Sequence, residues 1–262
     1  LTTGKIDLDH KLDGGWWRGK VHYVMARTHN GKSLVAKNTA LSAARAGVAT
    51  MIISTVIPRD DLMQELIAIE AGLPSYLVKT GQLSGAQFGA LLEAATRVNR
   101  MPLVIVSSRT LSAAELQTLV EENVRTHDVQ LVVVDYLQNM YAPPDKFKSK
   151  VDQIDYFSRS IVTITQRFNV AMVVTAQVNR QVEYRTDKRP TAADGDGSSK
   201  IEKDPDVLIG LYIPSRYDKT APSGAMEILV LKNRLTQRYG TVNVVIDSNS
   251  ERIRNGVRSS AE

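Results

Sequence analysis

One segment, Ala26-Arg27-Thr28-His29-Asn30-Gly31-Lys32-Ser33, has the residue types and spacing of a phosphate-binding (Walker A) loop, with alanine in place of the first glycine. In such a loop, backbone N–H groups surround the phosphates, a lysine contacts the β and γ oxygens, and a hydroxyl binds Mg²⁺. The pattern therefore predicts a site for ATP and Mg²⁺. The residues expected to contact the nucleotide are Arg27, Thr28, His29, Asn30, Gly31, Lys32 and Ser33.

Asp135 ends the apolar run 131–134, which has the composition of a buried strand. An acid at the carboxyl end of such a strand can hold Mg²⁺, directly or through water, beside Ser33. An aspartate at the end of a strand is common, but its combination with a phosphate-binding loop favours the metal role. The histidines show no ligand spacing and the chain has no cysteine, so we expect no other metal site.

Strand-like runs alternate with helical segments along the chain, which is typical of an α/β fold with a mostly parallel, twisted sheet flanked by helices. The strand-like runs are 21–25, 50–54, 103–106, 131–135 and 171–175, and the helical segments are 33–46, 59–70, 85–98, 112–126 and 151–168. Runs 208–213, 226–232 and 241–247 predict a C-terminal antiparallel extension. Ser112 and Glu115 have the spacing of a helix capping box. Segments 142–150 and 185–203 are polar and rich in helix breakers, and we expect loops there.

The composition narrows the possible classes of protein. A chain of 262 residues is long enough for one large domain with a real core. No apolar run is long enough for a membrane span, and the lack of cysteine excludes disulfides and thiolate metal sites. A net charge of +5 and a pI near 9.3 permit a polyanionic partner without requiring one.

Several further short sequence motifs follow one another along the chain. They are Thr3-Gly4, Asp135-Tyr136-Leu137-Gln138-Asn139-Met140, Ala176-Gln177-Val178-Asn179-Arg180, Asp187-Lys188-Arg189-Pro190, Ile201-Glu202-Lys203-Asp204-Pro205-Asp206 and Lys232-Asn233-Arg234. Together with the phosphate-binding loop, they make the chain resemble the C-terminal RecA-like domain of DnaB-type replicative helicases over nearly its whole length.

The resemblance implies a RecA-like P-loop NTPase fold forming a single ATPase/helicase domain over residues 1–262, with the family's N-terminal collar domain absent. It implies an ATP-dependent motor that assembles as a homo-oligomer, a six-membered ring around single-stranded DNA with ATP between subunits. A primase or a loader is a further implied partner. The implied location is the cytoplasm of a bacterial cell or a phage-infected bacterium, with no membrane association.

The resemblance also assigns roles to residues. The implied catalytic set is Lys32, Asp135, Gln177, Lys232 and Arg234. Gln177 would sense the γ-phosphate, and Lys232 and Arg234 would reach the adjacent subunit's site, with Arg234 as the arginine finger. DNA contacts would come from the two polar loops and their flanks. The residues implied for that role are Lys146, Lys148, Lys150, Arg180, Arg185, Lys188, Arg189 and Lys200.

The chain departs from the family pattern at two positions. Val56 stands where the family has the glutamate that polarises the attacking water, and valine can neither accept a proton nor orient a water molecule. Three explanations stay open: another acid compensates, hydrolysis is lost by nature or by engineering, or the segment is misaligned. In the second polar loop, Asp196 replaces an arginine, which removes one side-chain charge from the expected DNA surface.

Three functions are therefore in competition. The first is the ring-shaped helicase motor, and the second is an ATP-binding but hydrolysis-impaired ring or loading or regulatory factor, which Val56 favours. The third is a recombinase or signalling ATPase of the same superfold, because a fold alone does not determine function. The words around Asp135 and Gln177 favour the helicase motor.

Overall fold

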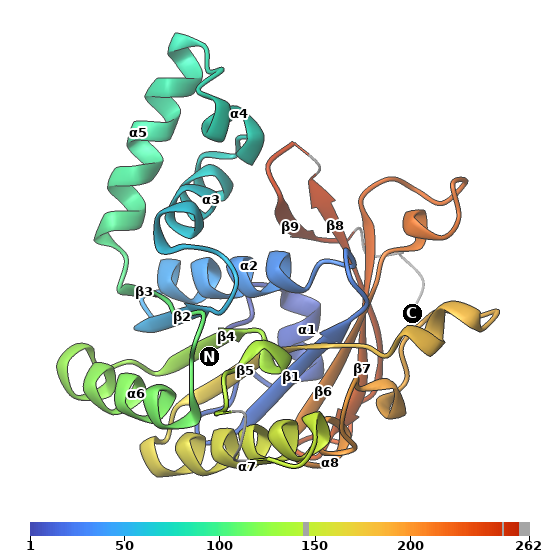
Figure 1. Ribbon diagram of the computed structural model, residues 1–262. Helices are drawn as coiled ribbons and strands as arrows, with labels where there is room; N and C mark the ends of the chain where they lie inside the picture. Colours follow the sequence, from blue (N-terminus) through green and yellow to red (C-terminus); the bar gives the residue numbers. More distant parts are fainter. Residues whose placement is uncertain (144–146, 248, 257–262) are drawn as a thin grey trace.

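The described residues, 1–143, 147–247 and 249–256 of this computed structural model, form one sheet of nine strands in the order β3-β2-β4-β5-β1-β6-β7-β8-β9 (Figure 1). Strands β3 to β6 of this order run parallel, and β7, β8 and β9 are added antiparallel. The expected fold class is confirmed. The strands are β1 (Val21–Ala26), β2 (Thr50–Ser54), β3 (Leu103–Ser107), β4 (Leu131–Asp135), β5 (Ala171–Gln177), β6 (Val207–Tyr212), β7 (Ala225–Asn233), β8 (Gly240–Asp247) and β9 (Arg252–Asn255).

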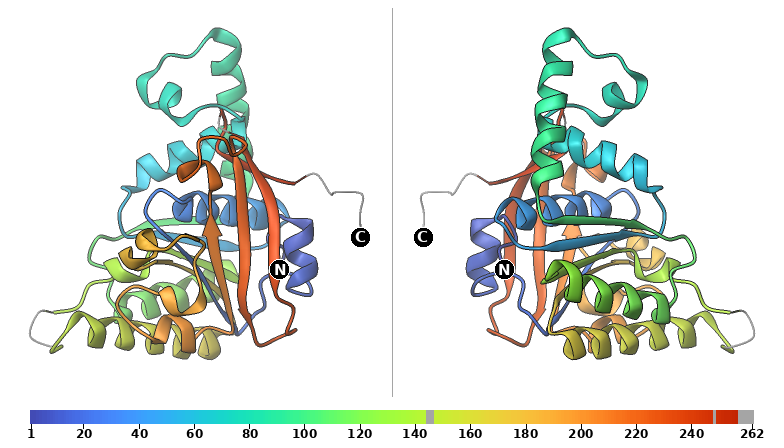
Figure 2. Two further views of the ribbon diagram at one scale, coloured as in Figure 1. Left: turned by 90° about the vertical axis from the view of Figure 1, so that its right-hand side faces the viewer. Right: turned by 90° about the vertical axis from the view of Figure 1, so that its left-hand side faces the viewer.

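Helices cover both faces of the parallel part of the sheet, and each face has its own apolar core (Figure 2). One face carries α1 (Ile6–Lys11), α2 (Lys32–Arg45), α3 (Arg59–Ala71) and the end of α5 (Gly85–Arg100); α4 (Ser75–Thr80) packs on α3. The other face carries α6 (Ala113–His127), α7 (Lys150–Phe168) and α8 (Lys200–Lys203). Alternate residues of β1 enter the two cores, Val24 on one side and Tyr23 on the other. Burial on both faces explains why these runs are continuously apolar.

The strand register brings three chemically important residues to one edge of the sheet. Ala26, the last residue of β1, pairs with Gln177, the last residue of β5. Strand β4 lies on the other side of β5 and ends at Asp135, which pairs with Ser54 of β2. Because the carboxyl ends of parallel strands share an edge, the expected phosphate-binding loop starts beside both Asp135 and Gln177.

Short elements are where the structure differs from the sequence expectations. The segment 185–203 is not entirely a loop: Ala192–Asp194 forms a 3₁₀ turn and Lys200–Lys203 forms α8. Helix α7 starts at Lys150, although the sequence pattern places this residue in the first loop. Helices α1 and α4 and strand β9 have no counterpart among the expected elements. Helices α1, α4 and α8 and strand β9 span four to six residues, which is too short for a hydrophobic period to be visible.

Of the capping box expected at Ser112 and Glu115, the structure shows one of the two bonds. The Ser112 hydroxyl accepts a hydrogen bond from the Glu115 N–H at 3.1 Å, just before α6 begins. A complete capping box, with both reciprocal bonds, is found instead at Ser84 and Gln87 before α5. In the part of the chain that the structure describes, no helix combines the length and apolarity that a membrane crossing needs.

Replacing Ser112 with alanine is expected to lower the free energy of unfolding by about 1 kcal/mol, because a helix N–H loses its acceptor. Urea denaturation followed by circular dichroism measures the change. Ser160→Ala is the matched control, since the Ser160 hydroxyl only donates to the Tyr156 carbonyl inside α7. Equal destabilisation by the two substitutions would show that the cap contributes nothing specific.

Candidate functional site

The phosphate-binding loop joins β1 to α2 with its glycine in a left-handed conformation. Gly31 has φ +85°, a left-handed conformation that favours glycine; a Cβ there would also displace the end of the Met226 side chain, 2.4 Å away. Gly31 is also the N-cap of α2, and no side chain caps this helix. The first N–H groups of α2 are therefore available to an anion. Ala26, by contrast, is an ordinary buried strand residue, which explains why the loop tolerates a Cβ there.

Lys32 lies folded back into the loop. Its Nζ donates to the Ala26 carbonyl at 3.1 Å and approaches the Arg27 carbonyl at 3.5 Å. Burial lowers the pKa of Lys32, and the negative charge of Asp135 partly opposes this effect. An ammonium held in a partly desolvated loop by carbonyls alone is well prepared to exchange them for phosphate oxygens.

Asp135 is 5% exposed and is held by two threonines. The Thr175 hydroxyl donates to Oδ1 of Asp135 at 2.5 Å, and the Thr55 N–H donates to the Asp135 carbonyl at 2.8 Å. Within the described ranges, Oδ2 has no hydrogen-bond partner and is free to bind a metal. Asp135 Oδ2 and the hydroxyl of Ser33, the second residue of α2, are the oxygens that could hold Mg²⁺, which prefers oxygen ligands. Sequence reasoning missed both threonines, because nothing in the sequence distinguishes Thr175 from its neighbours in β5 or Thr55 from the residues that follow β2.

The side chains of Arg27 and Asn30 attach the loop to other segments of the chain by hydrogen bonds. Arg27 donates from Nε to Glu183 Oε1 at 2.9 Å and from Nη1 to the Val178 carbonyl at 2.9 Å. Asn30 is buried, accepts from the Ile213 N–H at 3.1 Å and donates to the Tyr217 hydroxyl at 3.2 Å. The Arg27 guanidinium therefore points at Glu183, so its expected contact with nucleotide falls to its backbone.

Gln177 connects the loop to the segment that contains Asp196. Its Nε2 lies 3.5 Å from the Thr28 hydroxyl, and its carbonyl accepts from the Asp196 N–H at 2.8 Å. Gln138 bridges the same two residues: its amide donates to the Gln177 and Asp196 carbonyls at 3.3 and 3.1 Å and accepts from the Gln177 N–H at 3.0 Å. Sequence reasoning assigned no role to Gln138, since its partners are 39 and 58 residues away.

Lys232 and Arg234 lie at the opposite edge of the sheet. The Arg234 N–H donates to the Asp206 carbonyl, and the Asp206 N–H donates to the carbonyl of Val21, the first residue of β1. The full length of β1, about 17 Å, separates this position from the loop after Ala26. Lys232 donates to the Glu202 and Lys203 carbonyls at 2.6 and 2.9 Å; burial, followed by repulsion from Arg234, lowers its pKa to about 8. Neither side chain can therefore contact a nucleotide bound at the phosphate-binding loop of its own chain.

The residues expected to contact DNA differ in how far their side chains are already engaged within the chain. Lys148, Lys150 and Arg180 are exposed. Arg185 and Arg189 instead form ion pairs within the chain, with Asp194 at 2.7 Å and Glu227 at 2.6 Å, and these pairs shape the second loop. Lys188 donates to the Arg185 carbonyl at 3.0 Å, and Lys200 lies 3.9 Å from Asp204. Lys146 lies outside the described residues.

Val56 is 48% exposed just beyond β2, two residues after Ser54, the partner of Asp135 in the sheet. Val56 therefore follows the strand that lies beside Asp135 in the sheet, and its N–H donates to the Ser54 hydroxyl at 3.3 Å. Asp60 and Asp61 start α3 and are exposed, with no bond to Lys32 or Asp135 among the described residues. Glu183 is the acid that the fold does place beside the loop, through its pair with Arg27, and no pattern in the sequence indicates it.

Comparison with known proteins identifies the family of the chain. The family model of the DnaB-like helicase C terminal domain matches residues 1–255. The chain belongs to this family. Replicative DNA helicase DnaB of Leifsonia xyli subsp. xyli is 29% identical over 236 residues, which cover 89% of this chain and 51% of that protein. The chain thus spans about half the length of the curated relatives it matches.

Two solved structures share the fold. One, described as an ATPase domain, superposes with a TM-score of 0.92 at 23% identity, covering 98% of this chain and 91% of that one. The other, a DnaB-like replicative helicase whose interactions with primase were determined, gives the same TM-score and identity, with 62% of that chain covered. The RecA-like fold and the family expected from the sequence are both confirmed.

Proposed function

We propose that this chain is the motor domain of a ring-shaped replicative helicase that hydrolyses ATP and moves along single-stranded DNA in the bacterial cytoplasm. The observation that carries the proposal is the division of the expected machinery between two edges of the sheet. The phosphate-binding loop, Asp135 and Gln177 share one edge, and Arg234 lies at the other. A site that needs an arginine finger is then complete only when a second copy supplies it, as in a closed ring.

The residues of the loop edge fit ATP with Mg²⁺. Uncapped N–H groups of α2 and the Lys32 ammonium would bind the phosphates, and Ser33 and Asp135 would hold the metal. When bound, Mg²⁺ would neutralise charge on the β and γ oxygens. Gln177 would report the state of the γ-phosphate to the segment around Asp196 through the bonds that join them.

The DNA contacts belong to the same proposal. Lys148, Lys150, Arg180 and Lys200 are the side chains that would track the phosphate backbone, with backbone N–H groups of the second loop beside them. The ion pairs of Arg185 and Arg189 would hold that loop in shape. Binding should therefore weaken steeply with salt and show little dependence on base sequence.

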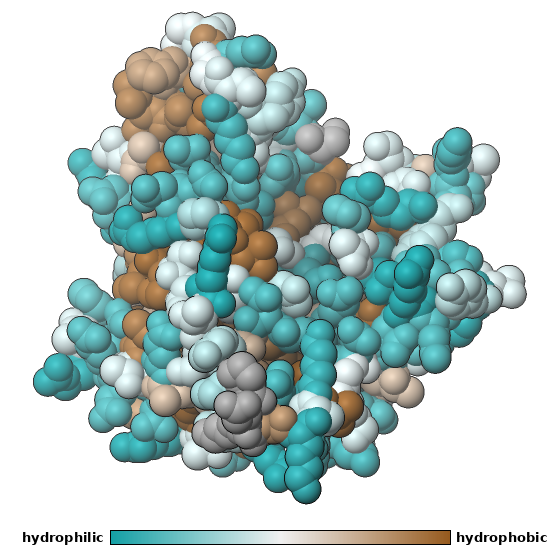
Figure 3. Space-filling model, viewed as in Figure 1, coloured by the Kyte–Doolittle hydropathy of each residue, from teal (hydrophilic) through white to brown (hydrophobic). Residues whose placement is uncertain are grey.

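Exposed apolar residues support a larger assembly. Apolar side chains gather over the projecting α5 (Figure 3), where Phe88 and Leu92 are 52% and 54% exposed. Exposed apolar groups that gather in this way commonly mark a surface that another chain covers. Such a contact fits a homo-oligomeric, six-membered ring. Because one structural neighbour was solved for its interactions with primase, primase is a proposed partner, and a loader is another.

Two measurements test the function. Size-exclusion chromatography of the ATP-bound chain reports whether it forms a ring, and a forked DNA substrate reports whether it separates strands. The motor proposal requires a ring and ATP-dependent separation of strands. A chain that forms rings and binds ATP, but neither hydrolyses it nor separates strands, would leave the hydrolysis-impaired ring or loading or regulatory factor as the better description. Val56 is the feature that favours this second function.

Replacing Lys32 with alanine is expected to weaken ATP binding between about tenfold and a hundredfold, because one charge-assisted hydrogen bond to phosphate is lost. Equilibrium titration with a fluorescent ATP analogue measures the affinity directly, whatever the turnover. Lys37→Met is a poor control because Lys37 is paired with Glu65; Lys219→Met, at an exposed position, is the matched one. Unchanged affinity in Lys32→Ala would remove the nucleotide assignment.

A further inference from the structure

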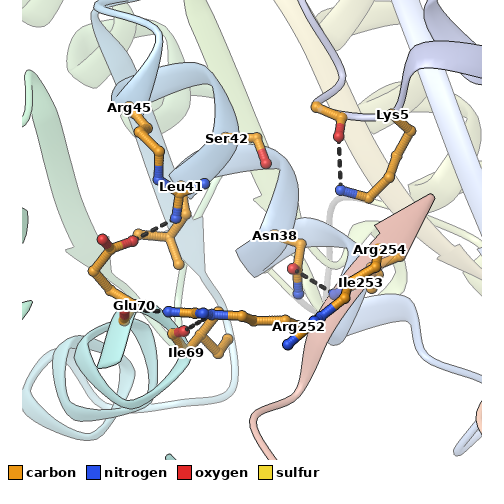
Figure 4. Close-up of a pocket in the computed structure, with 11 residues that line it drawn as sticks. Lys5, Asn38, Leu41, Ser42, Arg45, Ile69, Glu70, Arg252, Ile253 and Arg254 are labelled. Carbon is orange, nitrogen blue, oxygen red and sulfur yellow. Dashed lines mark hydrogen bonds and ion pairs between the residues drawn. The ribbon is translucent and has the colours of Figure 1, made fainter. Parts of the chain in front are cut away.

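A second polar pocket lies at the far end of α2 from the phosphate-binding loop (Figure 4). It has a volume of about 320 Å³ and lies between the C-terminal half of α2, the end of α3, strand β9 and the segment at Gly4. Along the axis of α2, its lining residues lie between about 9 Å (Asn38) and about 20 Å (Arg45) from Lys32. The charged residues that line it are four cations, Lys5, Arg45, Arg252 and Arg254, and one carboxylate, Glu70.

Lys5 is the unusual member of this lining. It is 7% exposed, and its Nζ donates to the neighbouring Gly4 carbonyl at 2.9 Å. No carboxylate lies within ion-pair distance of it among the described residues, although an ammonium has three hydrogens to donate. Burial is the main cause that lowers the pKa of Lys5 to about 8; repulsion from Arg45 adds to this, and Asp9 opposes it. A buried, unpaired ammonium is costly unless an anion compensates it.

The one carboxylate of the lining does not provide that compensation. Glu70 is already paired with Arg45 and, at 3.0 Å, with Arg97 on α5. Arg252 donates to the Ile69 carbonyl at 2.7 Å and to the Glu70 carbonyl, at the C-terminal end of α3. Its charge is therefore matched by main-chain carbonyls alone. After internal pairing, the pocket keeps an excess of positive charge at Lys5 and Arg252.

We propose that this anion pocket, lined by Lys5, Arg45, Arg252 and Arg254, binds a small phosphate-type oxyanion. The oxyanion is either inorganic or the phosphate end of a small metabolite. Lys5 supplies a desolvated ammonium, and the guanidinium of Arg252 is held in place by the end of α3. Arg254, an exposed residue of the pocket lining, is paired with Asp247 at 2.8 Å. A preformed cluster of donors with unmatched charge is what multiply charged oxyanions require.

Calorimetric titration of inorganic pyrophosphate into the Lys32→Ala chain tests the proposal, because this variant weakens the phosphate-binding loop. We expect binding that Lys5→Met and Arg254→Gln each weaken at least about tenfold. Arg125→Gln, an exposed substitution on α6 at the other face of the sheet, is the matched control and should change nothing. Thermal unfolding checks the fold of Lys5→Met, whose Tm should not fall, because a buried unpaired charge has been removed.

Absence of pyrophosphate binding, or binding that Lys5→Met leaves intact, would overturn the proposal. A competition with ADP on the same Lys32→Ala chain distinguishes the two sources of the oxyanion. If ADP displaces pyrophosphate in a Lys5-dependent way, the pocket accepts the phosphates of a metabolite. If ADP does not displace pyrophosphate, the ligand is inorganic. Either result of this competition supports the anion pocket.

Discussion

Replacing Val56 with glutamate is expected to raise the rate of ATP hydrolysis by at least about a hundredfold, the usual contribution of a well-placed general base. Val56 follows β2 at the edge that carries Asp135, and about half of its side chain is free of protein contacts. A carboxylate at this point would face the water that attacks the γ-phosphate, whereas a valine side chain cannot bind that water at all.

Steady-state ATP hydrolysis in the presence of single-stranded DNA measures the effect. Val56→Gln is the matched control, because it has nearly the size of glutamate and a polar end, but cannot accept the proton. The prediction is contradicted if the chain turns over ATP at an ordinary rate, about 10 s⁻¹, and Val56→Glu adds nothing. Glu183 would then be the first acid to substitute, since it lies beside the loop through Arg27.

Replacing Arg234 with glutamine is expected to lower ATP hydrolysis about a thousandfold while leaving the affinity for nucleotide at the chain's own loop unchanged. Arginine fingers contribute on this scale because they stabilise charge that develops on the transferring phosphoryl group. The affinity should survive because Arg234 lies at the far edge of the sheet, beside Asp206 and the start of β1. If the natural turnover is too slow to follow, the comparison is made in the Val56→Glu chain.

Mixing experiments separate a finger that acts in the neighbouring subunit from one that merely supports the fold. An equimolar mixture of Arg234→Gln and Lys32→Ala chains should recover activity, because some interfaces then combine an intact loop with an intact arginine. Arg125→Gln, on the outer surface of α6, should be indistinguishable from the unsubstituted chain. A mixture no more active than its separate components would rule out action across an interface.

The sequence predicted those parts of the site that lie at strand ends and in the phosphate-binding loop. Asp135 and Gln177 could be placed together because buried parallel strands show themselves as apolar runs, and their carboxyl ends share an edge. The sequence could not predict that the Gln138 amide joins Gln177 to Asp196, whereas the Gln177 side chain lies beside Thr28. It depends on hydrogen bonds between segments 39 and 58 residues apart, and no local pattern encodes them.

The same limit applies to the charges. The sequence predicts a phosphate contact for Arg27 and DNA contacts for Arg185 and Arg189, but the fold gives each of the three a carboxylate partner. Lys5, in contrast, looks like one of the charges that break an apolar run near the N-terminus, and the fold buries it without a carboxylate partner among the described residues. Whether a charged residue is paired is decided by which distant element packs against it.

The Gln138 amide ties the end of β5 and the residue Asp196 into a single rigid piece. Both ends of this amide are occupied by main-chain groups, so it cannot rotate without giving up all three bonds at once. A displacement of Gln177 would therefore act on Asp196 through these bonds and through the direct bond from the Asp196 N–H to the Gln177 carbonyl. In the proposed motor, cutting the Gln138 amide back to a methyl group would uncouple the loop around Asp196 from Gln177 while leaving the nucleotide site itself in place.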